Sequence, residues 1–206
     1  MIAGIVLAAG GGRRFGGHKQ LAELDGRPLL EHALRAMAAA PLDRVFVVLG
    51  ADAAEVQRQV DPHGAEPVFC DGWEDGMSTS LRTGVDAADA AGADAVVIAL
   101  GDQPRLSPRA VGRLIDARGE AAALRASYGG IAGHPVLLER KLFSLVRELH
   151  GDDGARAVLV AYRARKVACD DLGSPFDVDT PADLARLRPF LFRVRTAGRR
   201  LSILRR

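Results

Sequence analysis

Residues 1–19 read MIAGIVLAAGGGRRFGGHK, an apolar run that leads into a loop of glycines and basic side chains. The run at 2–8 is short, contains branched apolar residues and ends near glycine, which is typical of a buried strand. No basic segment precedes it and no small-residue cleavage pattern follows it, so we do not interpret it as a secretion signal. We therefore expect a β-strand that delivers a glycine-rich loop at its carboxyl end.

Short apolar runs and helical patterns alternate along the rest of the chain. The strand candidates are 2–8, 44–49, 66–70, 93–100 and 167–169. The helix candidates are 28–37, with Pro28 at the first helical position, and 52–60, 80–91, 108–118, 139–149 and 182–187. Because residues 96–100 are apolar throughout, that strand must be buried on both faces, as in a parallel sheet covered by helices. The pattern predicts a single-domain, Rossmann-like three-layer α/β/α fold with a mostly parallel central sheet.

The composition narrows the class of protein. The chain has 206 residues, of which 48% are hydrophobic and 26% charged, values that exclude disorder and collagen-like structure. Cys70 and Cys169 are far apart and have no metal-ligand spacing, so neither a disulfide framework nor a thiolate zinc site is expected. No stretch approaches the roughly 20 apolar residues of a membrane span. We expect a cytoplasmic protein that does not span a membrane.

The charge is unevenly distributed. Residues 191–206 contain six arginines and no acidic residue, and they account for the formal net charge of +2. We therefore divide the chain into a domain at 1–190 and an Arg-rich tail at 191–206. Such a tail could contact nucleic acid or a membrane surface. Since Phe192 is its one aromatic residue, we expect a solvated or loosely packed end and no nucleic-acid partner.

The glycine-rich loop after the first strand has the chemistry of a phosphate site. Glycines at 10–12 allow backbone N–H groups to approach an anion closely. The loop fits neither a Walker A motif, because glutamine follows Lys19, nor a dinucleotide fingerprint, because Phe15 stands at its last glycine. It delivers Arg14 and Lys19, cations that suit a triphosphate and a departing pyrophosphate. The alternative is a flexible, solvated hairpin, but the chain has only 3 Lys beside 25 Arg, which favours a specific role for Lys19.

Carboxylates mark the candidate metal site. Asp102 follows the most apolar strand and so lies at the carboxyl edge of the sheet, where ligands bind in open α/β sheets. Mg²⁺ prefers one or two carboxylates together with phosphate oxygens and water, so Asp102 needs a companion. Asp177 and Asp179 are the candidates, and in an extended segment they point to opposite faces. The alternative is that Asp179 or Thr180 caps the helix that follows, which would not exclude metal binding.

Several of these segments resemble one family. LAAGGGRRFGGHK at 7–19 is similar to the LAAG-x-S-x-R-M-G-x-x-K signature of MobA-like nucleotidyltransferases, although Gly12 replaces the usual serine and Phe15 the usual methionine. The glycine removes a hydroxyl contact to phosphate but no charge. The resemblance implies catalytic roles for Arg14 and Lys19. The nucleotide-binding residues that it implies in this segment are Leu7, Ala8, Ala9, Gly10, Gly11 and Gly12.

Other segments extend the resemblance over residues 1 to about 190. The segment at 177–184 resembles the family's D-x-D-T-P-x-D-L motif and favours Asp179 over Asp177 as a metal ligand. GMSTSLR at 76–82 resembles the GMS-x-S-L-R-x-G motif of the cytidylyltransferases, which implies base or ribose contacts for Ser78 and Ser80. From local sequence alone, this segment could be nothing more than a helix cap.

Two further segments are similar to the acceptor side of the same family. GIAGHPVLL at 130–138 resembles its G-H-P-V-L-L segment and HGDDGAR at 150–156 its G-D-x-G-A-R segment. The implied substrate-binding residues are Gly133, His134 and Arg156. His134 could also be a proton acceptor, or merely a turn residue before Pro135.

The resemblance is closest to the molybdenum cofactor cytidylyltransferases. It implies Mg²⁺-dependent transfer of CMP from CTP to the terminal phosphate of molybdenum cofactor, with release of pyrophosphate, and a molybdenum hydroxylase as a possible client. In the resembled families LAAG accompanies cytidine nucleotides and LAGG guanine, so Ala9 favours CTP. Three alternatives stay open: another nucleotide such as GTP, another small phosphorylated acceptor, and a non-catalytic carrier of the cofactor.

Overall fold

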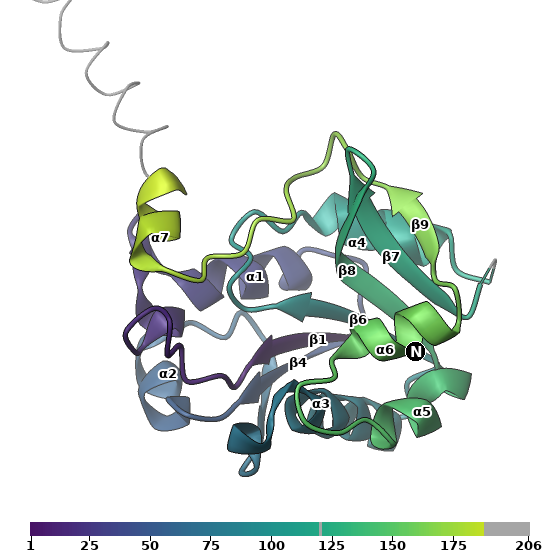
Figure 1. Cartoon of the computed structure of the whole chain (residues 1–206), viewed down its shortest axis with the longest axis horizontal. Helices are drawn as coiled ribbons and strands as arrows, with labels where there is room; N and C mark the ends of the chain where they lie inside the picture. Colours follow the sequence, from purple (N-terminus) through teal and green to yellow (C-terminus); the bar gives the residue numbers. More distant parts are fainter. Residues whose placement is uncertain (120, 188–206) are drawn as a thin grey trace, which may run out of the picture.

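The computed structural model describes residues 1–119 and 121–187, so the Arg-rich tail lies outside the described residues. Its centre is a seven-stranded sheet (Figure 1) with the order β5-β4-β1-β6-β8-β7-β9. The strands are β1 (Ile2–Ala8), β4 (Arg44–Leu49), β5 (Glu66–Phe69), β6 (Ala95–Leu100), β7 (Ala123–Tyr128), β8 (Ile131–Glu139) and β9 (Arg165–Ala168). Only β8 runs antiparallel to its neighbours, and every other pair is parallel. The predicted α/β fold with a mostly parallel sheet is confirmed.

Helices cover both faces of the sheet and complete the predicted three layers. α1 (Leu29–Ala38), α2 (Ala53–Gln59) and α4 (Pro108–Asp116) contribute to one apolar cluster. α3 (Met77–Ala90), α5 (Phe143–Arg147) and α6 (Ala155–Ala161) contribute to the cluster on the other face. Side chains of β1 alternate between them: Val6 and Ala8 face the first, Ala3 and Ile5 the second. The central strands are therefore buried on both faces, as their apolar sequences required, whereas the outer strands β5 and β9 are mostly exposed.

Short elements complete the fold. α7 (Pro181–Leu187) packs with Leu24, Leu29 and Val178 in a small third cluster. β2 (Glu23–Leu24) and β3 (Arg27–Pro28) form a separate antiparallel pair. The 3₁₀ turns are η1 (Lys19–Leu21), η2 (Trp73–Asp75) and η3 (Arg140–Leu142). None of the helices formed by residues 1–119 and 121–187 is long and apolar enough to cross a membrane.

The elements of the parallel half follow the sequence prediction closely, whereas those of the other half do not. β1 and β4 have the predicted bounds, and β5 and β6 differ from prediction by one and two residues at one end. In the other half, β9 was predicted at 167–169 but begins two residues earlier and ends one residue earlier. β7, β8 and α6 were not predicted. The predicted helix at 139–149 is wrong in its first turn, because Glu139 is the last residue of β8 and α5 covers only Phe143–Arg147. His134 and Pro135 interrupt the apolar run of β8, so the strand has no clear local signal.

Two helix starts also differ from expectation. Pro28 is the residue before α1 rather than its first residue. α3 begins at Met77, nearly one turn earlier than predicted, and places Ser78 and Ser80 inside the helix. Gly76 takes the position before the helix, with no side-chain cap, so the interpretation of these serines as a cap is wrong.

Candidate active site

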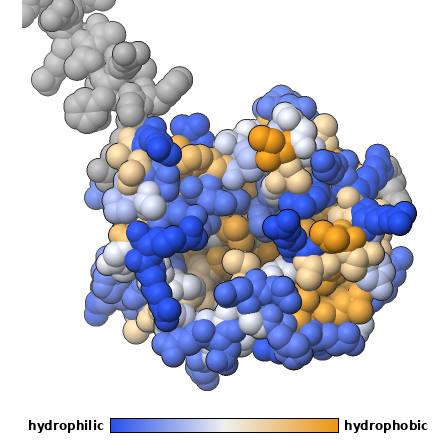
Figure 2. Space-filling view, in the orientation of Figure 1, coloured by the Kyte–Doolittle hydropathy of each residue, from blue (hydrophilic) through white to orange (hydrophobic). Residues whose placement is uncertain are grey.

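A pocket of about 630 Å³ opens at the carboxyl ends of β1 and β6. Figure 2 shows the hollow near the centre of the face in view, with hydrophilic side chains around it. The pocket brings together the glycine-rich loop, the start of α3, the end of β6 and the segment before α7. Eleven predicted site residues line it: Leu7, Ala8, Ala9, Gly10, Gly11, Gly12, Arg14, Lys19, Ser80, Asp102 and Asp179.

The glycine-rich loop turns tightly around one carbonyl. Gly12 has φ +58°, and its carbonyl oxygen accepts hydrogen bonds from the backbone N–H groups of Phe15, Gly16 and Gly17 at 2.9–3.2 Å. Gln20 holds the loop from below, because its buried amide nitrogen donates to the carbonyls of Ala8 and Gly10 at 2.8 and 2.7 Å. The loop is therefore an ordered turn against the pocket and not the solvated hairpin of the alternative interpretation.

Lys19 joins the two candidate metal ligands. Its ammonium lies 2.6 Å from Oδ2 of Asp102 and 3.4 Å from Oδ1 of Asp179. The Lys19 side chain is only 15% exposed, whereas Arg14, which lies 3.2 Å from the other oxygen of Asp179, is 76% exposed. Oδ1 of Asp102 is buried and has no hydrogen-bond partner among the described residues. The carboxylates converge on one point, and one of them retains a free buried oxygen.

These residues fit a hard divalent cation. In residues 1–119 and 121–187 no group of three His, Cys, Asp or Glu side chains is placed to hold a metal. Two converging carboxylates are nevertheless what Mg²⁺ uses when substrate phosphates and water supply its other ligands. The unpartnered oxygen of Asp102 provides a direct reason for a cation at this point, because a buried charged atom needs a partner.

In the segment before α7, different residues are available for capping the helix and for binding a metal. Thr180 and Asp183 form a reciprocal cap: the Asp183 carboxylate accepts from the Thr180 backbone N–H at 2.9 Å, and Thr180 Oγ1 accepts from the Asp183 backbone N–H at 3.2 Å. The carboxylate of Asp179 is thus left for the pocket. Asp177 does not line the pocket and accepts a hydrogen bond from Gln103 Nε2 at 2.6 Å. Desolvation raises its pKa, and the neighbouring carboxylates of Asp102 and Asp179 add to the effect.

The start of α3 forms the opposite wall of the pocket. Gly76 has φ +110°, and a side chain there would meet the carbonyl of Gly151 at 2.3 Å, so the loop before α6 can approach closely. The Ser78 backbone N–H donates to the same carbonyl at 3.0 Å. Ser80 lines the pocket, whereas Ser78 is fully buried and does not. Of the two serines predicted to contact the nucleotide, only Ser80 lines the pocket.

The predicted acceptor residues lie beside the pocket rather than on its lining. Gly133 packs against the segment before α7, since a side chain there would meet Pro175 at 2.6 Å. His134 lies inside β8, so its interpretation as a turn residue is wrong. Burial, with a contribution from Arg125, lowers the pKa of His134 to about 4, and the imidazole is neutral at pH 7. Arg156 lies in the first turn of α6.

Sequence reasoning missed three residues of this region. Gln20, directly after Lys19, fixes the glycine-rich loop, and its position beside the motif was a usable signal. Trp73 lines the pocket and lies under Gly11. Arg125, on β7, lies close enough to His134 for its charge to lower the pKa of the imidazole. No pattern in the local sequence marks Arg125 as a site residue.

Comparison with known proteins gives relatives of nearly full length. The chain is 33% identical to a molybdenum cofactor guanylyltransferase of Rhodobacter capsulatus over 190 residues, which cover 90% of this chain and 94% of the relative. It is 34% identical to a protein named nicotine blue oxidoreductase, from Paenarthrobacter nicotinovorans, over 90% of this chain and 96% of that one.

Solved structures show the same fold. The crystal structure of Rv0371c from Mycobacterium tuberculosis H37Rv in complex with manganese superposes with a TM-score of 0.76 and 31% identity, covering 90% of this chain and 97% of that one. The MobA-like NTP transferase domain matches residues 4–167, which include the glycine-rich loop, Lys19 and Asp102. With that match over most of its length, the chain belongs to the MobA-like NTP transferase family.

Proposed function

We propose that this protein is a cytidylyltransferase that transfers CMP from CTP to the terminal phosphate of molybdenum cofactor and releases pyrophosphate. One observation carries the proposal: the ammonium of Lys19 lies between the carboxylates of Asp102 and Asp179 in a pocket that the glycine-rich loop closes. This combination provides donors for a triphosphate and ligands for a divalent cation in one place.

The reaction needs positioning more than proton transfer. An oxygen of the acceptor phosphate attacks the α-phosphorus of the nucleotide, and the bond from that phosphorus to the oxygen bridging to the β-phosphate breaks. The nucleophile is already an anion, so no strong general base is required. Backbone N–H groups of the glycine-rich loop, Arg14 and Lys19 would bind the nucleotide phosphates and stabilise the negative charge that moves onto pyrophosphate.

Asp102 and Asp179 would hold the metal ion. Mg²⁺, when bound, would supply positive charge to the reacting phosphates. A structure of similar fold contains manganese, which supports a divalent cation without selecting magnesium over manganese. The ion pairs of Lys19 with both carboxylates hold Asp102 and Asp179 near one another.

The choice of base rests on the loop at the end of β1. Ala9 is buried and lines the pocket, and its alanine follows the pattern of the cytidine-specific members in the resemblance. The guanylyltransferase relative makes GTP the competing candidate. Replacing Ala9 with glycine would test whether this side chain decides between the two bases.

The acceptor assignment rests on Gly133, His134 and Arg156, beside the pocket. The pair of carboxylates around Lys19 favours a catalyst over a non-catalytic carrier, because a carrier does not need two carboxylates that bind a metal ion. A molybdenum hydroxylase is the client that such a product would serve.

The test is pyrophosphate release by the purified protein with molybdenum cofactor, in Mg²⁺ or Mn²⁺, and with CTP, GTP, ATP or UTP. Release with CTP that disappears in Asp102→Ala would support the proposal. Pyrophosphate release with GTP alone would support the nucleotidyl transfer reaction but overturn the assignment of CTP as the nucleotide. Release with a different phosphorylated acceptor but not with the cofactor would overturn the acceptor, and no release at all would favour the carrier.

A further inference from the structure

Arg125 has an unusual environment on β7. It pairs with Val136 of β8, and the Val136 side chain belongs to the apolar cluster that also contains Ala155 and Val158 of α6. Arg125 therefore projects to the sheet face that α6 covers (Figure 1). Among the described residues, its Nε is the one cationic side-chain atom that is buried with no hydrogen-bond partner. The Arg125 side chain is only partly buried, but this nitrogen has lost its hydration without gaining a partner among the described residues.

The groups nearest to Arg125 do not neutralise it. Arg156 of α6 is close enough to repel it, and burial together with this repulsion lowers the pKa of Arg125. His134 is neutral at pH 7 and can donate or accept one hydrogen bond. No carboxylate in residues 1–119 and 121–187 pairs with either arginine. The cluster of Arg125, His134 and Arg156 is positively charged without a counterion.

This cluster borders the candidate active site. Gly133, next to His134, packs on Pro175 in the segment that leads to Asp179. Arg156 follows the loop whose Gly151 carbonyl binds the start of α3 and whose Asp152 lines the pocket. The cluster thus lies on the β8 and α6 side, and the glycine-rich loop is on the β1 side. The two buried charged atoms left without a partner near the pocket, Oδ1 of Asp102 and Nε of Arg125, are of opposite sign.

We propose that Arg125 binds the phosphate of the acceptor substrate, with Arg156 and the neutral His134 completing the site. A phosphate monoester presents several oxygens to a guanidinium fork and carries the negative charge that two arginines require. The acceptor's identity as molybdenum cofactor rests on the proposed function. The phosphate chemistry rests on the cluster itself. Arg125 would fix the position of the attacking oxygen and the glycine-rich loop that of the nucleotide.

The kinetic test compares Arg125→Met with Arg125→Lys and the wild type at saturating CTP. Arg125→Met should raise KM for molybdenum cofactor by about 10-fold or more and leave KM for CTP within about twofold, since the loss concerns a charge-assisted contact to the acceptor alone. Arg125→Lys should recover part of the loss. Arg35→Met, which changes an exposed arginine on α1, is the matched control and should behave as wild type. Equal changes in both KM values would overturn the proposal.

A binding test is independent of turnover. Inorganic phosphate is the probe, and Lys19→Ala is the background because it weakens phosphate binding on the nucleotide side. Phosphate should raise the Tm of Lys19→Ala and should have no such effect on Lys19→Ala/Arg125→Met. A Tm shift that survives in the double variant, or no shift in Lys19→Ala, would contradict the anion site. If no nucleotide supports pyrophosphate release, the proposed function fails while this measurement still decides the site.

Misfolding would not explain the expected result. Because the Nε of Arg125 is buried without a partner, Arg125→Met should have a Tm, in the absence of phosphate, equal to or above that of the wild type. Because Arg125→Met keeps an unbranched side chain of similar length, the apolar contacts with α6 are retained. A Tm below that of the wild type would show that Arg125 has a structural role and would overturn the proposal.

Discussion

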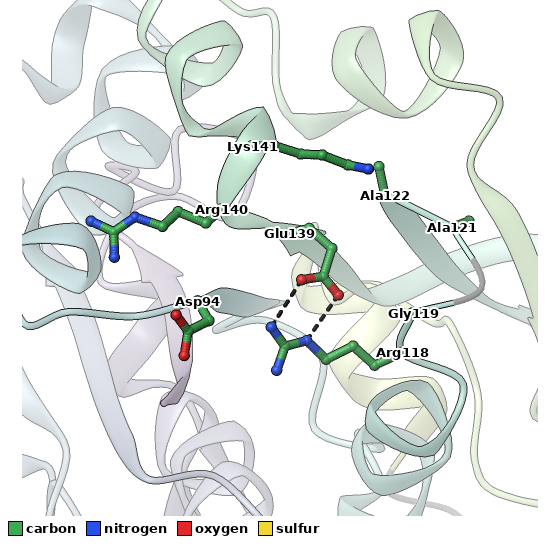
Figure 3. A pocket seen from close by; sticks show the side chains of 8 residues that line it. All are labelled: Asp94, Arg118, Gly119, Ala121, Ala122, Glu139, Arg140 and Lys141. Atoms are coloured by element: carbon green, nitrogen blue, oxygen red, sulfur yellow. Dashed lines mark hydrogen bonds and ion pairs between the residues drawn. The ribbon is translucent and has the colours of Figure 1, made fainter.

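Charged side chains lie both at the carboxyl edge of the central sheet, where β1 and β6 end, and at the opposite edge, where these strands begin. The two groups are arranged differently. At the carboxyl ends of β1 and β6, Lys19 forms ion pairs with two carboxylates. One buried oxygen of Asp102 has no hydrogen-bond partner among the described residues. At the opposite edge, shown in Figure 3, a second pocket contains Arg118 and Glu139 joined by two hydrogen bonds of 2.8 and 2.9 Å. Asp94 there binds the N-terminal ammonium, and Arg140 binds Asp89.

This difference in charge pairing distinguishes a ligand-binding site from an ordinary protein surface. At the opposite edge, Arg118 pairs with Glu139, Asp94 with the N-terminal ammonium and Arg140 with Asp89, so these charges satisfy one another. Charges at the carboxyl edge are left with capacity for a ligand, and burying them in that state costs free energy that a ligand can recover. The two pockets have similar volumes, about 750 and 630 Å³, so pocket volume does not identify the site.

The strongest test of this comparison is Lys19→Ala. Turnover should fall by about 100-fold or more, because a preorganised cation at the developing charge of pyrophosphate is lost. Steady-state pyrophosphate release measures the effect. Lys141→Ala is the matched control, because Lys141 lines the opposite pocket and points away from the Arg118–Glu139 pair (Figure 3). Near-wild-type turnover by Lys19→Ala would refute the assignment of the carboxyl edge as the active site.

The second test addresses the metal. Asp179→Asn should raise the Mg²⁺ concentration needed for half-maximal activity by about 10-fold or more, since the site would lose one of two carboxylate ligands. EDTA should abolish turnover, and added Mg²⁺ or Mn²⁺ should restore it. Asp177→Asn should have a smaller effect, because Asp177 lies outside the pocket and contacts Gln103. A larger effect of Asp177→Asn would exchange their roles.

The third test uses pH. The pKa of His134 is about 4 in the folded protein and 6.5 in the unfolded chain, so between these values the unfolded chain binds the extra proton. Stability from this group is complete above about pH 6.5 and is lost as pH falls toward 4. Between pH 7.5 and 5, the Tm of the wild type should fall about 3–6 °C more than that of His134→Gln. Identical Tm profiles measured by calorimetry would show that His134 does not titrate in this way.

The smallest effect is expected at the opposite edge. Glu139→Gln leaves Arg118 without its carboxylate and should lower Tm by about 2–4 °C, corresponding to roughly 1 kcal/mol. Pyrophosphate release should not change. Arg118→Met combined with Glu139→Met should recover part of the Tm, because neither charge remains unpaired. A loss of activity in Glu139→Gln would break the distinction between the two edges.

The sequence by itself determined the parallel half of the sheet. It also determined the part of the active site that lies on the loops after these parallel strands. The strands at Ile2–Ala8 and Arg44–Leu49 are apolar runs with flanking turns. Asp102 closely follows β6, and Lys19 stands at the end of the glycine-rich loop that follows β1. Local patterns suffice there, because a strand buried on both faces must be apolar, and the carboxyl edge of a parallel sheet is where its loops meet.

Tertiary structure alone decided β7 and β8. β8 contains His134 and Pro135, and β7 contains Arg125, so neither has the uninterrupted apolar pattern of a buried strand. They are strands because each pairs with a neighbour distant in sequence or joined by a turn, and such pairing energy is not visible in a local window. For the same reason the environment of Arg125 could not be predicted: its burial, and its neighbours His134 and Arg156, come from three separate elements that only the packing of α6 on the sheet brings together.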